Sequence, residues 1–458
     1  MQQGFIKTAA VTPKIRVADP AYNAQVILEK LEEAWEHGAR IIVFPELCLT
    51  GYTCGDLFLQ QKLLEEAKRQ LLLIANATEG KDALVMVGLP LERDGRLYNV
   101  AAVLQDGAIL GMVPKSNIPS YAEFYEGRHF SQGNAQVVSY YLEGEEIPFG
   151  TNLLFECMNL PGLTVGCEIC EDLWVASPPG TNHGLMGASV IVNLSASNET
   201  VGKGEYRELL VRSASARLIC GYIYASAGEG ESTQDLVFGG HNLIAENGVI
   251  LAQSKRFTGE TVYGDLDLQR IAAERRRMGT FGKEPDLSYV AVPFKLNIME
   301  TKLERSFERM PFVPKDQAAR NKRCEEILSI QAFGLKKRYE HTGLKTAVIG
   351  VSGGLDSTLA LLITVRTFDM LGLDRRGITA VTMPCFGTTD RTYENACRLA
   401  KTLNTTLREV DIRDAVLIHF RDIGQDQKNH DITYENGQAR ERTQVLMDIA
   451  NQQNGLVI

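Results

Sequence analysis

Three polar side chains stand at the ends of apolar, strand-like runs. Cys170 follows the run 163–169 in GCEICEDLW, Glu46 follows the run 41–44 in FPELCLTGY, and Lys115 follows a proline in GMVPKSNIP. A thiol must lose its proton before it attacks an amide carbon, and a carboxylate can accept that proton. A lysine ammonium beside a backbone N–H stabilises the resulting oxyanion. If the three strand ends meet at one rim of a sheet, they predict an enzyme that cleaves an amide.

Each of these residues also has a structural explanation. Taken singly, Cys170 fits a buried structural cysteine, Glu46 a cap or rim carboxylate, and Lys115 a solvated surface residue. No histidine lies within ten residues of Cys170. A papain-like Cys–His pair therefore lacks support but stays open, because such partners can be distant in sequence.

A glycine loop, VSGGLDS (351–357), suggests a second chemistry. It follows the apolar run 346–351 and precedes a helical pattern over 357–371. Adjacent glycines let the backbone approach an anion, and a helix N-terminus directs N–H groups at it. The serines add hydroxyl donors, and Asp356 offers the oxygen that Mg²⁺ prefers. The alternative is a tight strand–helix turn with a serine cap; a P-loop is excluded because no lysine follows.

The elements that must position these residues are those of an α/β protein. Apolar runs predict strands at 84–89, 188–194 and 218–225, and helical spacing predicts helices at 23–37 and 205–217. Asp-Gly at 106–107 and Asn-Gly at 247–248 predict two hairpins, and hence a mixed sheet. We expect a first domain over 1–275, a proline-rich connector over 276–320, and a second domain of successive βα units over 321–458.

Composition narrows the class of protein. The 458 residues are 44% hydrophobic and 23% charged, which is typical of globular domains. The net charge of −9 argues against nucleic acid or an anionic membrane as partner. The nine scattered cysteines fit neither a disulfide scaffold nor a structural zinc site. With no secretory leader and no membrane-length apolar run, the sequence predicts a cytoplasmic protein.

In that order, the motifs PELCLTGY, VPKSNIP and CEICEDLW resemble the nitrilase, or carbon–nitrogen hydrolase, superfamily over residues 1–275. The resemblance implies an α-β-β-α sandwich with a Glu-Lys-Cys triad. By position it makes Glu46 the base, Lys115 the oxyanion stabiliser and Cys170 the nucleophile.

The same resemblance suggests residues that bind glutamine. Many members carry a second glutamate eight residues after the lysine, which is Glu123 in YAEFYE. Its alternative is a surface carboxylate. Ser197 in NLSAS is a candidate, although a plain turn serine fits as well. The expected glutamine-binding set is Tyr121, Glu123, Glu171, Ser197 and Lys203.

The segment SGGLDS resembles the pyrophosphate loop of the ATP pyrophosphatases, which cleave ATP between its α and β phosphates. That implies a doubly wound parallel sheet over 321–458, with Asp356 as a ligand of Mg²⁺. The expected ATP-binding residues are Ser352, Gly353, Gly354, Leu355, Asp356 and Ser357.

The order of nitrilase motifs, SGGLDST, MPCFGTTDRTYENA (383–396) and QARERTQ (438–444) resembles the glutamine-dependent NAD⁺ synthetases. This implies amidation of nicotinic acid adenine dinucleotide with ATP, Mg²⁺ and ammonia from glutamine. It also implies a homo-oligomer formed through the nitrilase domain, with neither nucleic acid nor membrane as partner.

Two other classes stay open: a stand-alone amidase with a vestigial second domain, and a non-catalytic interaction protein, against which the intact triad argues. The chain stops on Leu-Val-Ile, and the family's later metal-binding GTG(D/N)xxE segment is not in it. We therefore expect the second domain to be incomplete.

Overall fold

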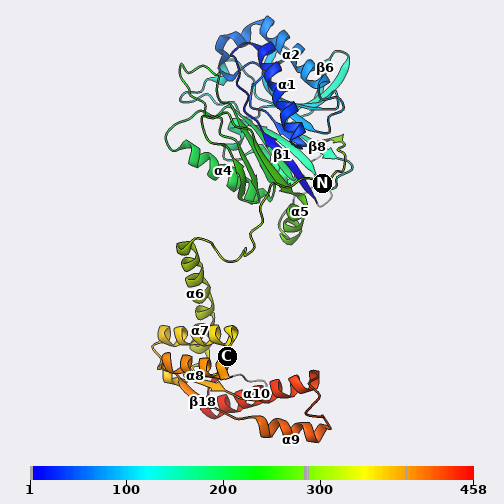
Figure 1. The fold of residues 1–458 in the computed structure, drawn as a ribbon. Helices are drawn as coiled ribbons and strands as arrows, with labels where there is room; N and C mark the ends of the chain where they lie inside the picture. The colour runs from blue at the N-terminus through cyan, green and yellow to red at the C-terminus, as the bar shows by residue number, and fades with distance from the viewer. Residues whose placement is uncertain (1–3, 283–285, 287, 387–389) are drawn as a thin grey trace. The chain divides into compact units, whose positions relative to one another are not determined.

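The chain folds into two compact units. The computed structural model describes residues 4–282, 286, 288–386 and 390–458 (Figure 1). One unit is Met1–Phe307 and the other is Glu308–Ile458. The boundary falls inside the segment 276–320, for which the sequence predicts a connector.

Two sheets form the centre of the first unit. The eight-stranded sheet has the order β14-β1-β2-β3-β4-β5-β7-β6, and the seven-stranded sheet has the order β13-β12-β11-β10-β9-β8-β15. Parallel and antiparallel pairs occur in both, so the sheets are mixed, as the hairpin signals predict. The strands are β1 (Phe5–Ala10), β2 (Ile41–Val43), β3 (Leu84–Arg93), β4 (Arg96–Gln105), β5 (Ala108–Pro114), β6 (Val138–Leu142), β7 (Glu145–Phe149), β8 (Leu153–Cys157), β9 (Thr164–Ile169), β10 (Val190–Ser195), β11 (Gly221–Ser226), β12 (Leu243–Glu246), β13 (Val249–Gln253), β14 (Val262–Asp267) and β15 (Val290–Phe294).

Helices cover the outer face of each sheet, which confirms the predicted α-β-β-α sandwich (Figure 1). One core joins the two sheets through residues such as Val43 and Val165. A second lies under α1 and α2, and a third lies under α4. The helices are α1 (Pro20–Glu36), α2 (Gln61–Asn76), α3 (Pro179–Leu185), α4 (Lys203–Leu218) and α5 (Leu268–Arg277), with short 3₁₀ turns η1 (Tyr52–Leu59), η2 (Glu126–Arg128) and η3 (Cys170–Leu173).

Both predicted hairpins are present. Strands β4 and β5 pair antiparallel across Asp106-Gly107, and β12 and β13 pair across Asn247-Gly248. All four turn residues have positive φ, from 44° to 82°. That conformation matches the right-handed twist of the flanking strands, which is why Asp-Gly and Asn-Gly are favoured there.

The end of the first unit packs back onto its sheets. Strand β15 pairs parallel with β8, so part of the expected connector belongs to a sheet. Residues 300–307, here called the strap, follow it. In the strap, Arg305 donates two hydrogen bonds of 2.8 and 2.9 Å to the buried carboxylate of Glu246.

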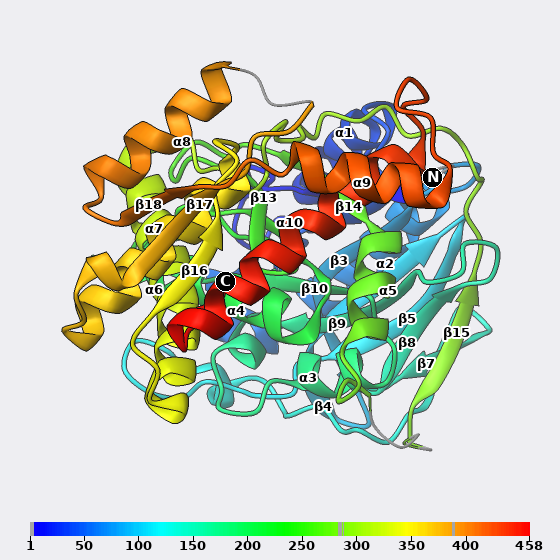
Figure 2. The same ribbon diagram turned by 90° about the horizontal axis from the view of Figure 1, so that it is seen from below.

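The second unit is a parallel sheet of order β18-β17-β16-β19. Ala347 and Ile349 of β16 pack on one face with α7, while Val348 between them packs on the other face with α10. Figure 2 shows α7 and α10 on opposite sides of β16. This alternation confirms the doubly wound arrangement. The elements are α6 (Gln317–Thr342), β16 (Ala347–Gly350), α7 (Leu355–Leu371), η4 (Arg375–Gly377), β17 (Ile378–Thr382), α8 (Asp390–Thr402), β18 (Thr406–Glu409), α9 (Arg413–Ile423), α10 (Ile432–Gln453) and β19 (Leu456–Val457). Over the described residues, no helix combines the length and apolar character that crossing a bilayer requires.

Candidate active site

The structure brings the predicted lysine and glutamate into direct contact. Lys115 Nζ lies 2.7 Å from Glu46 Oε1, and both side chains are fully buried. Glu46 follows β2 and Lys115 follows β5. Gly88 of β3 makes room for this turn, because a Cβ there would lie 2.4 Å from Leu47 N.

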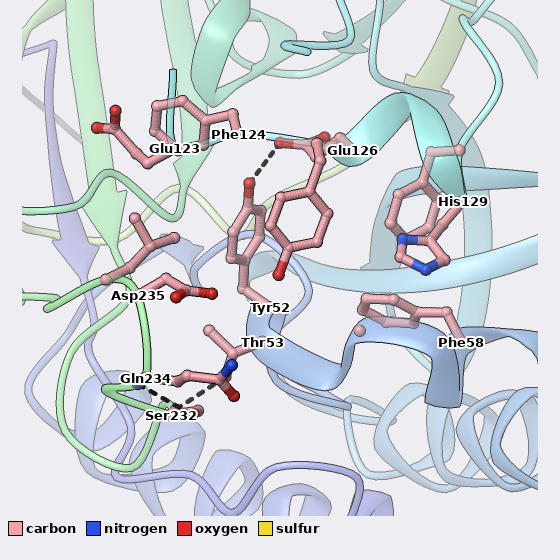
Figure 3. Close-up of a pocket in the computed structure, with 14 residues that line it drawn as sticks. Tyr52, Thr53, Phe58, Glu123, Phe124, Glu126, His129, Ser232, Gln234 and Asp235 are labelled. Carbon is pink, nitrogen blue, oxygen red and sulfur yellow. Dashed lines mark hydrogen bonds between the residues drawn. The ribbon is translucent and has the colours of Figure 1, made fainter. Parts of the chain in front are cut away.

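A second glutamate, which sequence reasoning missed, binds the same lysine. Lys115 Nζ lies 2.7 and 2.9 Å from the two oxygens of Glu126. The Tyr52 hydroxyl donates a 2.8 Å hydrogen bond to Glu126 Oε1 (Figure 3). The predicted Glu123 instead accepts a 2.7 Å hydrogen bond from Asn198 Nδ2. Figure 3 shows its carboxylate directed away from that of Glu126.

The Glu46 carboxylate has two further donors. Asn99 Nδ2 donates to Oε1 and the Ala196 N–H donates to Oε2, each at 2.7 Å. Burial opposes a charge on Lys115, but the carboxylates of Glu126 and Glu46 raise the pKa of its ammonium well above its ordinary value. Burial raises the pKa of Glu126, and Lys115 opposes that shift. The cluster is a buried ammonium between two carboxyl groups.

Cys170 lies where β9 ends and η3 begins, and the charges of this cluster act on its thiol. Its backbone has φ 43°, in the left-handed region that non-glycine residues seldom adopt. Burial and the charge of Glu46 raise the pKa of the thiol far above its ordinary value, while Lys115 and the Ala196 N–H lower it. The resting thiol is therefore neutral and requires a base before it can attack.

Asp172 ties the Cys170 turn to the loop that follows Lys115. Its buried carboxylate accepts hydrogen bonds from the N–H groups of Ile169 at 3.0 Å and Asn117 at 2.8 Å. The two chain segments are thus joined by one side chain next to the cluster.

The remaining predicted residues of the first unit form two contacting groups and one separate contact. The Tyr121 hydroxyl donates a 2.9 Å hydrogen bond to Glu171 Oε1. Lys203 hydrogen-bonds to Asn198, which also holds Glu123. The buried Ser197 hydroxyl accepts a 3.1 Å bond from the fully buried Arg207.

Aromatic rings flank the ammonium of Lys203. Its Nζ lies 5.3 Å from the ring centre of Phe124 and 5.2 Å from that of Trp174. Burial lowers the pKa of Lys203, and the carboxylates of Glu123 and Glu199 oppose this shift. A half-buried cation close to the nucleophile is suited to binding an anionic group of a substrate.

A cavity of about 80 Å³ adjoins the cluster on the side of Tyr52 and Glu126 (Figure 3). Glu123 and Glu126 lie in its wall, whereas Cys170 and Lys115 do not. Most of its wall is aromatic or polar: Tyr52, Phe58, Phe124, Tyr125, His129, Phe130, Ser232, Gln234 and Asp235.

In the second unit the glycine loop joins β16 to α7, as predicted. The Ser352 N–H donates to Ser357 Oγ at 3.2 Å, which closes the loop. Gly353 has φ 80°, and a Cβ there would lie 2.1 Å from the Thr392 carbonyl oxygen, so only glycine fits. Ser352 and Gly354 line a hollow of about 580 Å³ together with Arg442 of α10.

Asp356 and Leu355 are exposed in the first turn of α7, and Asp356 lines a different hollow from Ser352. The Asp356 carboxylate has no hydrogen-bond or ion-pair partner among the described residues. Among the residues that the structure describes, no group of three or more aspartate, glutamate, histidine or cysteine side chains could hold a metal ion. In the predicted segment 383–396, Met383 and Tyr393 line the same hollow as Ser352. Residues 387–389 of this segment lie outside the described residues.

Comparison with known proteins identifies both units. A family model described as carbon–nitrogen hydrolase matches residues 7–276, and one described as NAD synthase matches residues 327–458. The glutamine-dependent NAD(+) synthetase of Mycobacterium tuberculosis (strain ATCC 25618 / H37Rv) is 42% identical over 473 residues, which cover 100% of this chain and 69% of the relative. The enzyme of that name from Aquifex aeolicus is 29% identical over 96% of this chain and 72% of its own length.

Among solved structures, the glutamine-dependent NAD(+) synthetase of Cytophaga hutchinsonii aligns with a TM-score of 0.52 and 23% identity, over 99% of this chain and 74% of that one. This likeness supports the fold. Because the NAD synthase match accounts for the second unit, the stand-alone amidase interpretation is not favoured. The chain belongs to the glutamine-dependent NAD⁺ synthetase family, with a carbon–nitrogen hydrolase domain followed by an NAD synthase domain.

Proposed function

We propose that Cys170 hydrolyses glutamine and that the ammonia released amidates nicotinic acid adenine dinucleotide to NAD⁺ at the expense of ATP. The observation that carries the first half is the buried Lys115 held between Glu46 and Glu126, in electrostatic contact with the Cys170 thiol. A buried charge cluster around a neutral thiol favours catalysis over a purely structural role.

In this mechanism Glu46 takes the proton of Cys170, and the thiolate attacks the carboxamide carbon. The Ala196 N–H interacts with both Glu46 Oε2 and the Cys170 sulfur, so it can support whichever of the two is negative. Lys115 stabilises the oxyanion through its charge. Glu46 then returns the proton to the departing nitrogen, ammonia leaves, and a glutamyl thioester remains. Water hydrolyses the thioester to glutamate and regenerates the thiol.

Glutamine carries one ammonium and one carboxylate at its α carbon, and the predicted binding residues match these charges. Lys203 is a half-buried cation that can bind the α-carboxylate, while Glu171 and Glu123 can accept hydrogen bonds from the α-ammonium. Tyr121 and Ser197 would hold the remaining polar atoms. Charge-assisted contacts of this kind would select glutamine over a simple amide.

For the second unit we propose ATP binding at Ser352–Ser357, where the loop and the first turn of α7 direct N–H groups at phosphate. The nicotinate carboxylate takes AMP from ATP and releases pyrophosphate, and ammonia then displaces AMP. Asp356, exposed in the first turn of α7, would supply one oxygen ligand to Mg²⁺, and the substrate phosphates would supply others. Bound there, the ion would neutralise phosphate charge.

We also propose an oligomeric state and a cellular location. A homo-oligomer formed through the first unit is tested by the molar mass in light scattering. A cytoplasmic location is supported by the substrates expected, since ATP and the dinucleotide are intracellular metabolites, and cell fractionation tests it.

The decisive experiment on the first half compares two neighbouring buried cysteines. We expect Cys170→Ala to abolish glutamate release from glutamine without unfolding the protein. Cys167→Ala, three residues earlier on β9 and also buried, should retain activity. A diazo-ketone glutamine analogue should label Cys170 in the parent protein. Glutamine hydrolysis by Cys170→Ala, or labelling at Cys167 instead, would refute the assignment.

A further inference from the structure

Asn193 is a buried side chain directly behind the nucleophile. It lies on β10, which pairs with β9, and its register partner on that strand is Glu168. Its Oδ1 accepts a 3.1 Å hydrogen bond from the Cys170 N–H and a 2.7 Å bond from the Ser195 hydroxyl. The side chain is fully buried, so water cannot replace these bonds.

The orientation of the Asn193 amide is fixed from its other end. Its Nδ2 donates a 3.2 Å hydrogen bond to the Tyr222 hydroxyl oxygen. That hydroxyl in turn donates to the buried carboxylate of Glu168, whose second oxygen accepts the Gly180 N–H at 2.7 Å. The backbone N–H of Cys170 can only donate, which requires an acceptor on that side and leaves Nδ2 to donate to Tyr222. The amide oxygen therefore has to face Cys170.

Cys170 needs such a partner because its backbone leaves the strand. Its φ of 43° turns the chain from β9 into η3, so its N–H leaves the pattern of the parallel ladder. A left-handed residue other than glycine persists only where its surroundings hold it. The direction of the Cα–Cβ bond, and hence the position of Sγ, depends on that backbone conformation.

We propose that Asn193 is a positioning residue for the reaction: by accepting the Cys170 N–H, it holds the nucleophile in the left-handed conformation from which Sγ attacks the carboxamide. This inference rests on the proposed role of Cys170. Asn193 has no hydrogen bond to Tyr121, Glu171 or Lys203, so it should affect the chemical step and not the binding of glutamine.

The test is Asn193→Ala in the 458-residue chain, with glutamate release as the assay. We expect kcat to fall about 100-fold, because a displacement of roughly 1 Å at a reacting group has that effect. KM for glutamine should stay within about threefold, and labelling of Cys170 by the diazo-ketone analogue should slow in proportion to kcat. Tyr222→Phe keeps the Asn193 amide but removes the hydroxyl to which its Nδ2 donates. This variant should lower kcat by about two- to tenfold.

Asn242 supplies a matched control. It is also fully buried, and its Oδ1 accepts the Ser226 N–H at 2.9 Å at the end of the neighbouring strand β11. Asn242→Ala should lower thermal stability but leave kcat per folded protein within about threefold of the parent. This separates a general loss of a buried hydrogen bond from an effect on the nucleophile.

A folded Asn193→Ala variant with parental kcat and labelling rate would overturn the inference, as would an equal loss of kcat in Asn242→Ala. If Asn193→Ala does not fold, unchanged kcat and labelling in Tyr222→Phe would overturn it. In each of these cases an inactive Cys170→Ala leaves the proposed function standing. Activity in Cys170→Ala would instead refute the proposed function itself.

Discussion

Replacing Lys115 by methionine tests the buried charge cluster most directly. Methionine nearly matches the length of the lysine stem but removes the ammonium that contacts both Glu46 and Glu126. Breaking a buried ion pair by removing one partner costs about 3–5 kcal/mol of unfolding free energy. At 2–4 °C per kcal/mol for a large domain, the melting temperature of the first unit should fall by roughly 6–20 °C. Glutaminase turnover should fall by at least about 10²–10³-fold.

The loss of stability in Lys115→Met should depend on pH. Burial already raises the pKa of Glu126, and Lys115 is the group that opposes the rise. Without the ammonium, the folded state binds a proton at a carboxyl pKa above that of the unfolded chain. The folded state then holds more protons than the unfolded state between those two pKa values, so stability falls as pH rises through that window. The variant should therefore lie closer to the parent at pH 5 than at pH 8.

A double variant separates stability from catalysis. In Lys115→Met with Glu126→Gln, one of the two unpaired carboxylates becomes a neutral amide. The melting temperature should recover by several degrees relative to Lys115→Met, while turnover stays low because the ammonium is still absent. Calorimetry at the two pH values and the glutamate assay measure both quantities. A Lys115→Met protein that melts within about 2 °C of the parent, or a double variant that is no more stable than the single one, would refute the argument.

Three further substitutions address other parts of the protein. Lys203→Met should raise KM for glutamine by about 10–100-fold, because a charge-assisted contact is lost, and an unchanged KM in steady-state kinetics would exclude Lys203 from binding. Gly353→Ala should weaken binding of Mg-ATP at least about tenfold in calorimetric titration, since its Cβ meets the Thr392 carbonyl at a strained φ; equal affinity would place ATP elsewhere. Asp172→Ala should lower glutaminase kcat about 10–100-fold by freeing the Cys170 turn from the loop after Lys115, and parental kcat in the folded variant would contradict this.

Sequence patterns predicted the elements well where residue chemistry determines local conformation. The strand predicted at 163–169 is β9 (Thr164–Ile169), and the helix predicted at 205–217 is α4 (Lys203–Leu218). Both turns with Asp-Gly or Asn-Gly form hairpins, because few other residue pairs adopt two successive positive φ angles. The Glu46 and Lys115 strand ends meet at 2.7 Å as predicted, but the prediction of a single sheet rim is wrong for Cys170, which follows a strand of the other sheet.

The second glutamate shows where spacing stops being informative. The segment YAEFYE contains both Glu123 and Glu126, three residues apart. Residues 116–125 contain no helix or strand, so the number of residues after Lys115 does not determine which side chain turns back toward it. Only the fold shows that Glu126, at the start of η2, reaches the ammonium. Its signal in the sequence was the presence of two carboxylates in one motif.

The partners of the Cys170 backbone were even less predictable. Asn193 lies in an apolar run that reads as an ordinary strand, and its contact with Cys170 spans 23 residues. Tyr222 and Glu168 lie on two further strand segments. Such a network depends on strand order and register, which hydrophobic periodicity does not specify.

The strap decides where the protein can be divided for expression. A fragment that stops at residue 275 would lack β15, leaving β8 as an unpaired edge that can associate with other chains. It would also lack Arg305, so the buried Glu246 would lose its bidentate partner. Poor solubility of such a fragment would reflect these missing contacts and not a defect at Cys170. A fragment that ends after Phe307 keeps both, and is the suitable form for studying the hydrolase domain alone.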